Sequence, residues 1–148
     1  TMLEENKKAL ERWNDEDKKK FKKWFGKDDE TSRQKILDRV NKELDLNKKM
    51  TPDNFRDAHD NDPGLFAQVS PDDSGHTVEL GRAFPSAPRT GTNSKAGTIS
   101  HEMSHFNDIG GTDDHAYGPQ KCKILAKKYP NKALNNADNF EYYLENAN

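Results

Sequence analysis

Residues 101–105 read His101-Glu102-Met103-Ser104-His105, a run in which two histidines stand four positions apart. On a helix, residues four positions apart lie about 40° apart around the axis and roughly one turn along it, so both imidazoles face the same point. That geometry suits two ligands of a tetrahedral zinc ion, and Glu102 can reach a metal-bound water as general base. Chance produces this register on the order of once in a hundred chains of this length. The stretch therefore predicts a helix that binds zinc.

A zinc ion used in catalysis needs a third protein ligand and an open fourth position for water. The extended metzincin pattern requires a third histidine six residues after His105, but Gly111 stands there, so that pattern is excluded. Glu141 or Glu145 on a later helix could complete a thermolysin-like arrangement. A carboxylate just past the metal helix could also serve, because the two-glycine turn at residues 110–111 can swing the following residues back to the metal.

The segment after that turn reads Gly111-Thr112-Asp113-Asp114-His115-Ala116-Tyr117-Gly118. Together with residues 101–105 it resembles the HExxH and GTxDxxYG signature of the aspzincin metallopeptidases, the family of deuterolysins and peptidyl-Lys metalloendopeptidases. The resemblance implies one catalytic zinc ion bound by His101, His105 and Asp114, with Glu102 as general base and Tyr117 as the hydroxyl that supports the oxyanion. Asp113 or His115 would replace Asp114 if the loop were folded differently.

Simple chemistry agrees with these implied roles. Zinc lowers the pKa of its bound water to about 7, and Glu102 accepts the proton and passes it to the leaving amine. A carboxylate ligand weakens the metal as a Lewis acid, so a second electrophile such as the Tyr117 phenol is useful. The similarity to the family continues upstream in Ala83-Phe84, Ala87-Pro88, residues 90–98 and, more faintly, Trp24-Phe25-Gly26. The chain thus resembles a whole catalytic domain.

A second informative run covers residues 136–142. Asp138 and Glu141 are three positions apart, so on a helix their carboxylates lie on one face. Two nearby acids repel each other unless a cation binds between them, which suits the ammonium group of a lysine. The run resembles the peptidyl-Lys branch of the family, and this resemblance implies that both acids line the S1′ pocket. Taken by itself, the run would be an ordinary acidic helix surface.

The rest of the chain is predicted to be mostly helical. Apolar spacing predicts one or two helices from Leu3 to Phe25, ended by Gly26, and another from Thr31 or Ser32 to about Asn47. A short helix or turn follows at residues 51–55, and two strands joined by a turn are predicted at residues 65–69 and 77–80. Further helices are predicted at residues 94–107, 119–129 and 132–145.

The predicted fold class is α+β: a zincin-like metallopeptidase domain that is predominantly helical with a small antiparallel sheet. Residues 1–148 are expected to form a single domain. Residues 1–64 are its helical N-terminal part, and residues 65–148 contain the sheet, the metal helix and the C-terminal helices.

Composition narrows the possible partners. With 30% hydrophobic residues and a mean hydropathy of −1.22, the chain has no apolar run long enough to cross a bilayer, so no membrane partner is expected. The lysines at positions 18–23 directly follow the acids at positions 15–17, which favours a solvated helix face and argues against nucleic acid. The single cysteine, Cys122, excludes an intramolecular disulfide and is expected to be an inert thiol. His59 and His76 are expected to be surface or cap residues.

The combined prediction is a monomeric zinc endopeptidase that cleaves protein or peptide substrates on the amino side of lysine. The substrate is expected to pair with an edge strand at residues 77–80. Two functions of other classes stay open. One is a zinc amidohydrolase acting on a non-protein amide such as a cell-wall crosslink, and the other is a non-catalytic interaction module with a structural metal.

The sequence supports two alternatives for the cellular compartment. The resemblance implies a secreted or exported protein. Residues 1–5 carry no export signal and no disulfide can form within the chain, so a delivered toxin or effector domain with a specific protein target fits equally well.

Overall fold

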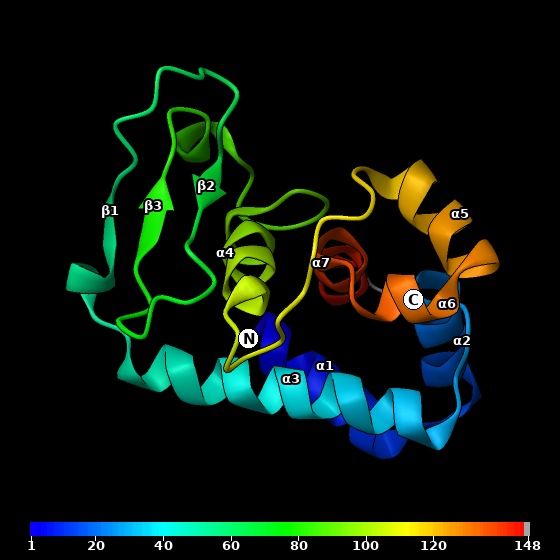
Figure 1. Ribbon diagram of the computed structural model, residues 1–148. Helices are drawn as coiled ribbons and strands as arrows, with labels where there is room; N and C mark the ends of the chain where they lie inside the picture. Colours follow the sequence, from blue (N-terminus) through cyan, green and yellow to red (C-terminus); the bar gives the residue numbers. More distant parts are fainter. Residues whose placement is uncertain (147–148) are drawn as a thin grey trace.

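The computed structural model describes residues 1–146, which form seven α-helices and a three-stranded sheet (Figure 1). The helices are α1 (Met2–Arg12), α2 (Asp15–Phe25), α3 (Glu30–Lys49), α4 (Lys95–His105), α5 (Pro119–Lys128), α6 (Pro130–Leu134) and α7 (Ala137–Glu145). The strands are β1 (Phe55–Asp57), β2 (Ala67–Gln68) and β3 (Val78–Leu80). In Figure 1 the long α3 runs beneath the molecule, and α4 stands between the sheet and α7. The predicted α+β class, mostly helical with a small sheet, is confirmed.

The first predicted helical stretch is two helices. Trp13 ends α1 in the left-handed conformation with φ of 50°, and Asn14 then begins α2 with a capping box completed by Asp17. Asp17 also binds the guanidinium of Arg12, with nitrogen to oxygen distances of 2.8 and 2.5 Å. Gly26, with φ of 84°, ends α2 as predicted, because glycine takes up this conformation without a steric penalty.

The sheet contains a strand that the sequence did not reveal. β2 and β3 pair antiparallel as predicted, but β1 lies on the other side of β3 and pairs with it in parallel, so the order is β1-β3-β2. The predicted helix or turn at residues 51–55 ends early as a single 3-10 turn, Pro52–Asn54, and β1 follows at once. Residues 1–64, expected as the helical N-terminal part, therefore contain one strand besides their helices. A strand of three residues is too short to show a period of two.

The predicted helix at residues 132–145 is also divided. α6 ends at Leu134 and α7 begins at Ala137, because the backbone between them binds the loop that follows α4. The amide of Asp113 donates to the carbonyl of Asn135, and the carbonyl of Asp113 accepts from the amide of Ala137. These bonds make a short parallel bridge between Asp113 and Asn136. The boundaries predicted for α3, α4 and α5 agree with the structure to within two residues.

α7 is the central element of the core. Eight of its nine residues are buried, and its aromatic side chains pack against Phe21 and Phe25 of α2 and against Leu10 of α1. On another side α7 packs against α4, whose Met103 joins a second apolar cluster with Phe106 and Ile109. Residues 101–105 thus lie on a helix that packs against the core on both sides, which fixes the position of that helix.

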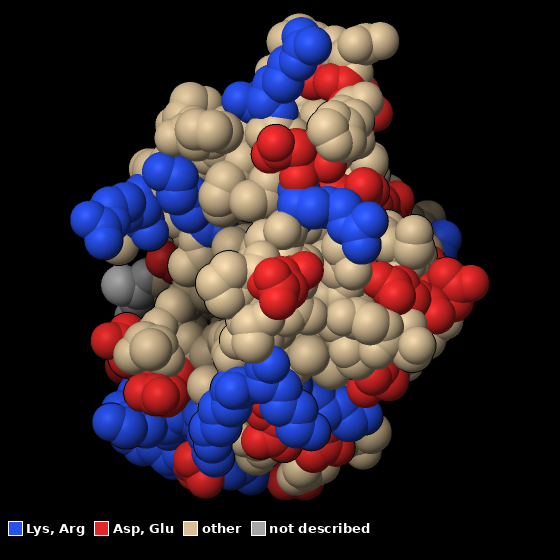
Figure 2. Space-filling view, turned by 90° about the vertical axis from the view of Figure 1, so that its left-hand side faces the viewer, with Lys and Arg blue, Asp and Glu red and all other residues tan. Residues whose placement is uncertain are grey.

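The surface is highly charged and mixed in sign. On the face shown in Figure 2, basic side chains gather along the lower edge, and acidic side chains lie among them. Within residues 1–146, no helix is both long and apolar enough to span a membrane.

Candidate metal centre and cleft

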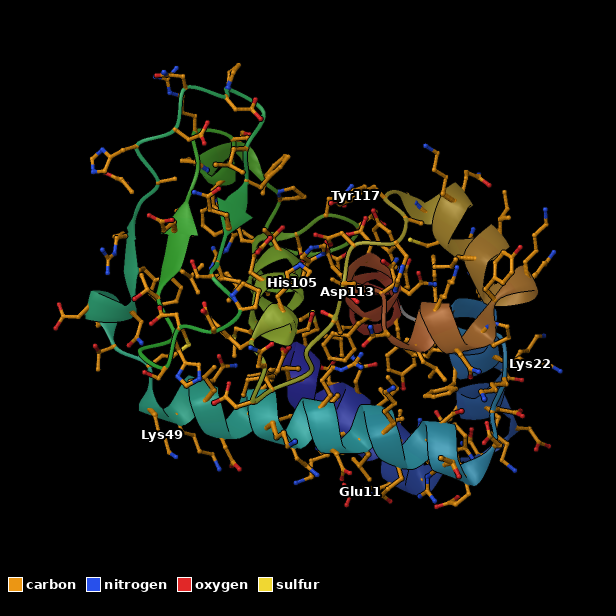
Figure 3. All side chains as sticks on the ribbon, in the orientation of Figure 1. Glu11, Lys22, Lys49, His105, Asp113 and Tyr117 are labelled. Carbon is orange, nitrogen blue, oxygen red and sulfur yellow. The ribbon has the colours of Figure 1, made fainter. Side chains whose placement is uncertain are left out.

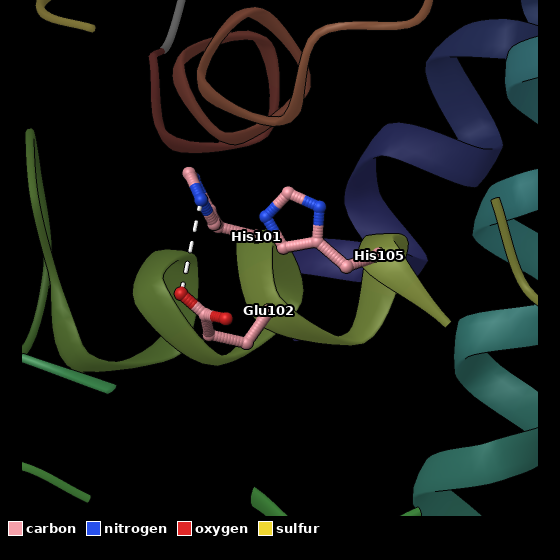
Figure 4. A group of neighbouring side chains, drawn as sticks. All are labelled: His101, Glu102 and His105. Carbon is pink, nitrogen blue, oxygen red and sulfur yellow. Dashed lines mark ion pairs between the residues drawn. The ribbon is translucent and has the colours of Figure 1, made fainter. Parts of the chain in front are cut away.

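The two histidines of α4 face the same point in space. Ser94 caps the helix by accepting a hydrogen bond from the amide of Gly97, and the helix continues unbroken to His105. The His101 and His105 rings lie on one side of α4 with their centroids 5.0 Å apart, as Figure 4 shows. The one-turn spacing predicted for this pair is therefore present.

A carboxylate from the following loop completes a three-sided group. Oδ1 of Asp114 lies 3.4 Å from Nε2 of His101 and 3.3 Å from Nε2 of His105. Zinc bonds of about 2.0–2.1 Å in a tetrahedron hold neighbouring ligand atoms about 3.3–3.4 Å apart. Asp114 Oδ1 therefore lies from each histidine nitrogen at the spacing of two ligands on one zinc ion, and the residues present fit this metal.

The flanking residues of the loop point elsewhere. The Asp113 carboxylate accepts a hydrogen bond from the side chain of Asn135, and Nε2 of His115 lies 3.9 Å from it. Glu145 binds the amides of Asn93 and Ser94 at the start of α4, 3.0 and 2.7 Å away. Of the carboxylates considered from the sequence, the structure brings Asp114 to the Nε2 atoms of both histidines.

Electrostatics in this group reflect the close packing of opposite charges. Burial would raise the pKa of Asp114, but hydrogen bonds from His101 and His105 outweigh burial and hold that pKa well below its usual range. Burial would likewise lower the pKa of His101, but the carboxylates around it raise that pKa well above the ordinary value. The same carboxylates would favour a divalent cation at this position.

The second nitrogen of each histidine is also engaged. Nδ1 of His105 donates to the carbonyl of Thr112 at 2.8 Å, and the hydroxyl of Thr112 bonds to that of Ser104 at 2.7 Å. Nδ1 of His101 lies 2.8 Å from Asp138 Oδ1 and 3.2 Å from Glu141 Oε1, although its N–H is aligned with neither. The hydrogen bond to Thr112 fixes the tautomer of His105 and leaves its Nε2 free to bind a metal.

Glu102 lies beside the metal group without completing it. Its Oε1 is 3.8 Å from Nε2 of His101, the contact drawn as a dashed line in Figure 4. The side chain is 13% exposed, and burial raises its pKa to about 7. A carboxylate with a pKa near neutrality can both accept and return a proton.

An open cleft of about 440 Å³ lies in front of these residues and extends to Tyr117 and to strand β2. Tyr117 is 61% exposed, and Figure 3 shows it with His105 and Asp113 in the middle of the molecule, whereas Lys22 and Lys49 lie at its periphery. Partial desolvation and the nearby Asp114 carboxylate raise the pKa of Tyr117, so the phenol keeps its proton at neutral pH. It can therefore donate a hydrogen bond into the cleft.

The two acids assigned to a lysine pocket lie deeper than the sequence suggested. Asp138 is 7% exposed and Glu141 is 4% exposed, and both face the ring of His101. Asp138 also accepts hydrogen bonds from the amide of Gly118 and the hydroxyl of Tyr142, whereas Oε2 of Glu141 has no hydrogen-bond partner in the part of the chain described. Glu141 therefore keeps an acceptor for a further donor.

Residues that the sequence reading passed over support the site. Thr112 and Ser104 hold His105, and the Asn136 side chain binds the loop next to Asp114. Their roles depend on contacts between distant segments. Thr112 stood within the GTxD motif, and Asn136 stood at the start of the run 136–142, which was interpreted through Asp138 and Glu141 alone. Of the other residues considered, His59 is exposed, His76 pairs with Asp108 at 2.8 Å, and Cys122 is fully buried.

Comparison with known proteins gives consistent matches. The aspzincin M35 family model, described as lysine-specific metallo-endopeptidase, matches residues 10–145. A solved structure titled zinc peptidase from Grifola frondosa superimposes with a TM-score of 0.84 at 36% identity, covering 97% of this chain and 85% of that one.

Curated relatives match over part of their length. An extracellular protease of Aeromonas hydrophila is 41% identical over 137 residues, which is 86% of this chain and 36% of the relative. A peptidyl-Lys metalloendopeptidase of Grifola frondosa is 55% identical over 83 residues, which is 56% of this chain and 24% of the relative. The chain therefore spans about a quarter to a third of the length of these two proteins.

Proposed function

The chain belongs to the aspzincin family of metallopeptidases, and from this membership we propose that it is a zinc-dependent endopeptidase that hydrolyses peptide bonds on the amino side of lysine. The observation that carries the proposal is the position of Asp114 Oδ1, which lies at nearly equal distances, 3.4 and 3.3 Å, from the two histidine Nε2 atoms. His101, His105 and Asp114 would hold the zinc ion. All three residues line the cleft.

A bound zinc ion supplies Lewis acidity, which polarises the scissile carbonyl and lowers the pKa of a water to about 7. Glu102 takes the proton from the attacking water and returns it to the leaving amine, which its raised pKa permits. Tyr117, protonated and at the edge of the cleft, donates a hydrogen bond to the oxyanion as it forms. Thr112 keeps His105 in one orientation throughout.

The substrate backbone pairs with β2 in this proposal. The sequence placed the pairing edge at residues 77–80, but that segment is β3, which has partners on both sides and offers no free edge. β2 is an outer strand, and its Ala67 and Gln68 line the same cleft as Glu102 and Tyr117. An extended peptide added to this edge would bring its carbonyl groups past the metal group.

Lysine selection would come from Asp138 and Glu141. Their three-residue spacing places both carboxylates on one face of α7, and the relatives named peptidyl-Lys metalloendopeptidases support this specificity. The free Oε2 of Glu141 offers an acceptor to one of the three donors of an ammonium group. A charge-assisted hydrogen bond of this kind contributes about 1.5–3 kcal/mol.

We propose further that the chain acts as a single catalytic domain and a monomer on lysine-containing proteins or peptides, without a nucleic-acid or membrane partner. Secretion or export is supported by the similarity to the extracellular protease of Aeromonas hydrophila. The Cys122 thiol takes no part in this chemistry, because burial raises its pKa to about 12.

Digestion of a denatured protein tests the proposal directly. Zinc-loaded enzyme should produce peptides whose new N-termini are lysine, as read by mass spectrometry. Glu102→Gln should bind zinc normally but turn over at least about 100-fold more slowly, the scale of lost general-base catalysis. Zinc-loaded wild-type enzyme that released no new peptides would contradict the proposal, and near-normal turnover by Glu102→Gln would remove Glu102 from the mechanism.

A further inference from the structure

Asp114 comes from a loop, unlike the two histidines. The segment between α4 and α5 has no regular secondary structure apart from one bridge residue, and the Asp114 side chain is 35% exposed. A metal ligand must be held within about half an ångström of its productive position to bind well. Some feature outside the loop must therefore fix Asp114.

We propose that Asn136 is a positioning residue that holds Asp114 and Tyr117 in place from the far side of the loop. This inference rests on the proposed metal-binding role of Asp114. Asn136 is fully buried at the start of α7, and its side chain is directed at the two residues that separate Asp114 from Tyr117.

The hydrogen bonds of Asn136 define both the position and the direction of the loop. Its Oδ1 accepts from the amides of His115 and Ala116 at 2.7 and 3.2 Å, and its Nδ2 donates to the carbonyl of Ala116 at 3.0 Å. Two amides require an acceptor and the carbonyl requires a donor, so only the amide side chain satisfies all three groups at once. A side chain of another type would leave backbone groups unsatisfied in a buried place.

Hydrogen bonds at both ends of the segment 113–118 also hold it against the start of α7. The backbone bridge between Asp113 and residues 135–137 holds the start of the segment, and the bond from the Gly118 amide to Asp138 holds its end. Asn136 lies between the two and is the side chain that binds the middle. α7 thus presents Asn136 to the loop and Asp138 to His101, so one helix orders two of the three ligands.

Asn139 provides a matched control within the same helix turn. It is also a fully buried amide, and its Nδ2 donates to the carbonyls of Trp24 and Cys122 at 2.6 and 2.9 Å. It accepts a hydrogen bond from Asn136 but makes none to residues 113–118. Loss of Asn139 should therefore weaken the fold as much as loss of Asn136 does, without releasing the loop.

The test measures metal binding and stability together. Zinc affinity from competition with a chelator, the visible spectrum of the cobalt-substituted protein and the melting temperature would be compared for Asn136→Ala, Asn139→Ala and Asp114→Ala. Asn136→Ala should bind zinc about 10 to 100 times more weakly and shift the cobalt bands, as expected when an outer partner of a ligand is lost. Asn139→Ala should lower the melting temperature with little change in zinc affinity. Asn136→Asp, which keeps an oxygen for both amides, should recover part of the affinity.

Equal zinc affinities for Asn136→Ala and Asn139→Ala would overturn the inference. If Asp114→Ala also bound zinc as tightly as wild type, the proposed ligand set would fail instead, so the two failures are distinguishable. Amide hydrogen exchange in the wild-type protein covers the case in which the variants do not fold. The His115 and Ala116 amides should exchange slowly even after chelation of zinc, and exchange at the rate of an open loop would equally overturn the inference.

Discussion

Asp114 and His115 are adjacent in the sequence, yet their side chains meet different partners. Oδ1 of Asp114 lies against both histidines of α4, whereas Nε2 of His115 faces Asp113 at 3.9 Å. We therefore expect Asp114→Ala to lose more than about 100-fold in zinc affinity, beyond the usual effect of an outer-shell change. His115→Ala should keep its zinc. Metal content after dialysis against a weak chelator would check both, and the reverse result would show that the third ligand is wrongly assigned.

Single substitutions can also distinguish the roles of Asp138 and Glu141. Asp138 is tied to His101, to Gly118 and to Tyr142, so Asp138→Asn should weaken zinc binding about 10 to 100-fold. Glu141 has a free oxygen, so Glu141→Gln should retain zinc but lose about one to two powers of ten in kcat/KM for lysine substrates. Zinc titration and the P1′ distribution of a peptide-library digest measure the two effects. An unchanged lysine preference in Glu141→Gln would exclude it from the pocket.

At the scale of elements, the start of α4 depends on a glycine. Gly97 lies in the first turn of the helix, where alanine would normally be favoured by about 1 kcal/mol. A Cβ there would overlap the carboxylate of Glu145, which binds the amides of Asn93 and Ser94. Gly97→Ala should therefore destabilise the protein by about 1–3 kcal/mol, as overpacking does. Urea unfolding would measure the change.

The double variant Gly97→Ala with Glu145→Ala provides the matched control. Removal of the Glu145 carboxylate removes the overlap. Gly97→Ala should therefore lower the free energy of unfolding by less in a Glu145→Ala background than in the wild type. If the loss of stability in the double variant equalled the sum of the losses in the two single variants, the overlap would not be the cause.

Helices could be predicted from the sequence where the residues at their own ends determine the boundary. Ser94, Gly26 and Pro119 mark helix boundaries by their own chemistry, and the motifs supplied the three residues that meet at the Nε2 atoms. β1 and the division between α6 and α7 could not be predicted. Both depend on backbone pairing with a distant segment, to β3 in one case and to Asp113 in the other. For the same reason the contacts of Asp138 with His101 were missed.

At the scale of the whole molecule, the chain must resist its own proposed activity. It contains 18 lysines, and all except Lys27 lie within the seven helices. Proteolysis requires an extended segment, and Lys27 is in the connection between α2 and α3. We expect zinc-loaded enzyme that is gently warmed to cut first before Lys27, and before other lysines only as the helices unfold. N-terminal sequencing of the fragments over time would check this order.

Glu102→Gln under the same conditions should stay intact, which separates self-cleavage from a contaminating protease. If the active enzyme remained uncut when partly unfolded, the proposed lysine specificity would be contradicted.

The attachment of the Asp114 loop to α7 also affects biosynthesis. A ribosome releases the chain from its N-terminus, so residues 101–114 emerge before residues 135–138 do. The nascent chain then has all three proposed ligands but neither Asn136 nor the backbone bridge that hold Asp114. Its lysines are unfolded and vulnerable in that interval, and the late arrival of α7 delays the assembly of an active centre until the helices that contain them can form. Ribosome-bound chains in which residues 1–130 have emerged from the exit tunnel and α7 has not should therefore bind zinc far more weakly than released protein, and tight binding by such chains would show that the loop orders itself without α7.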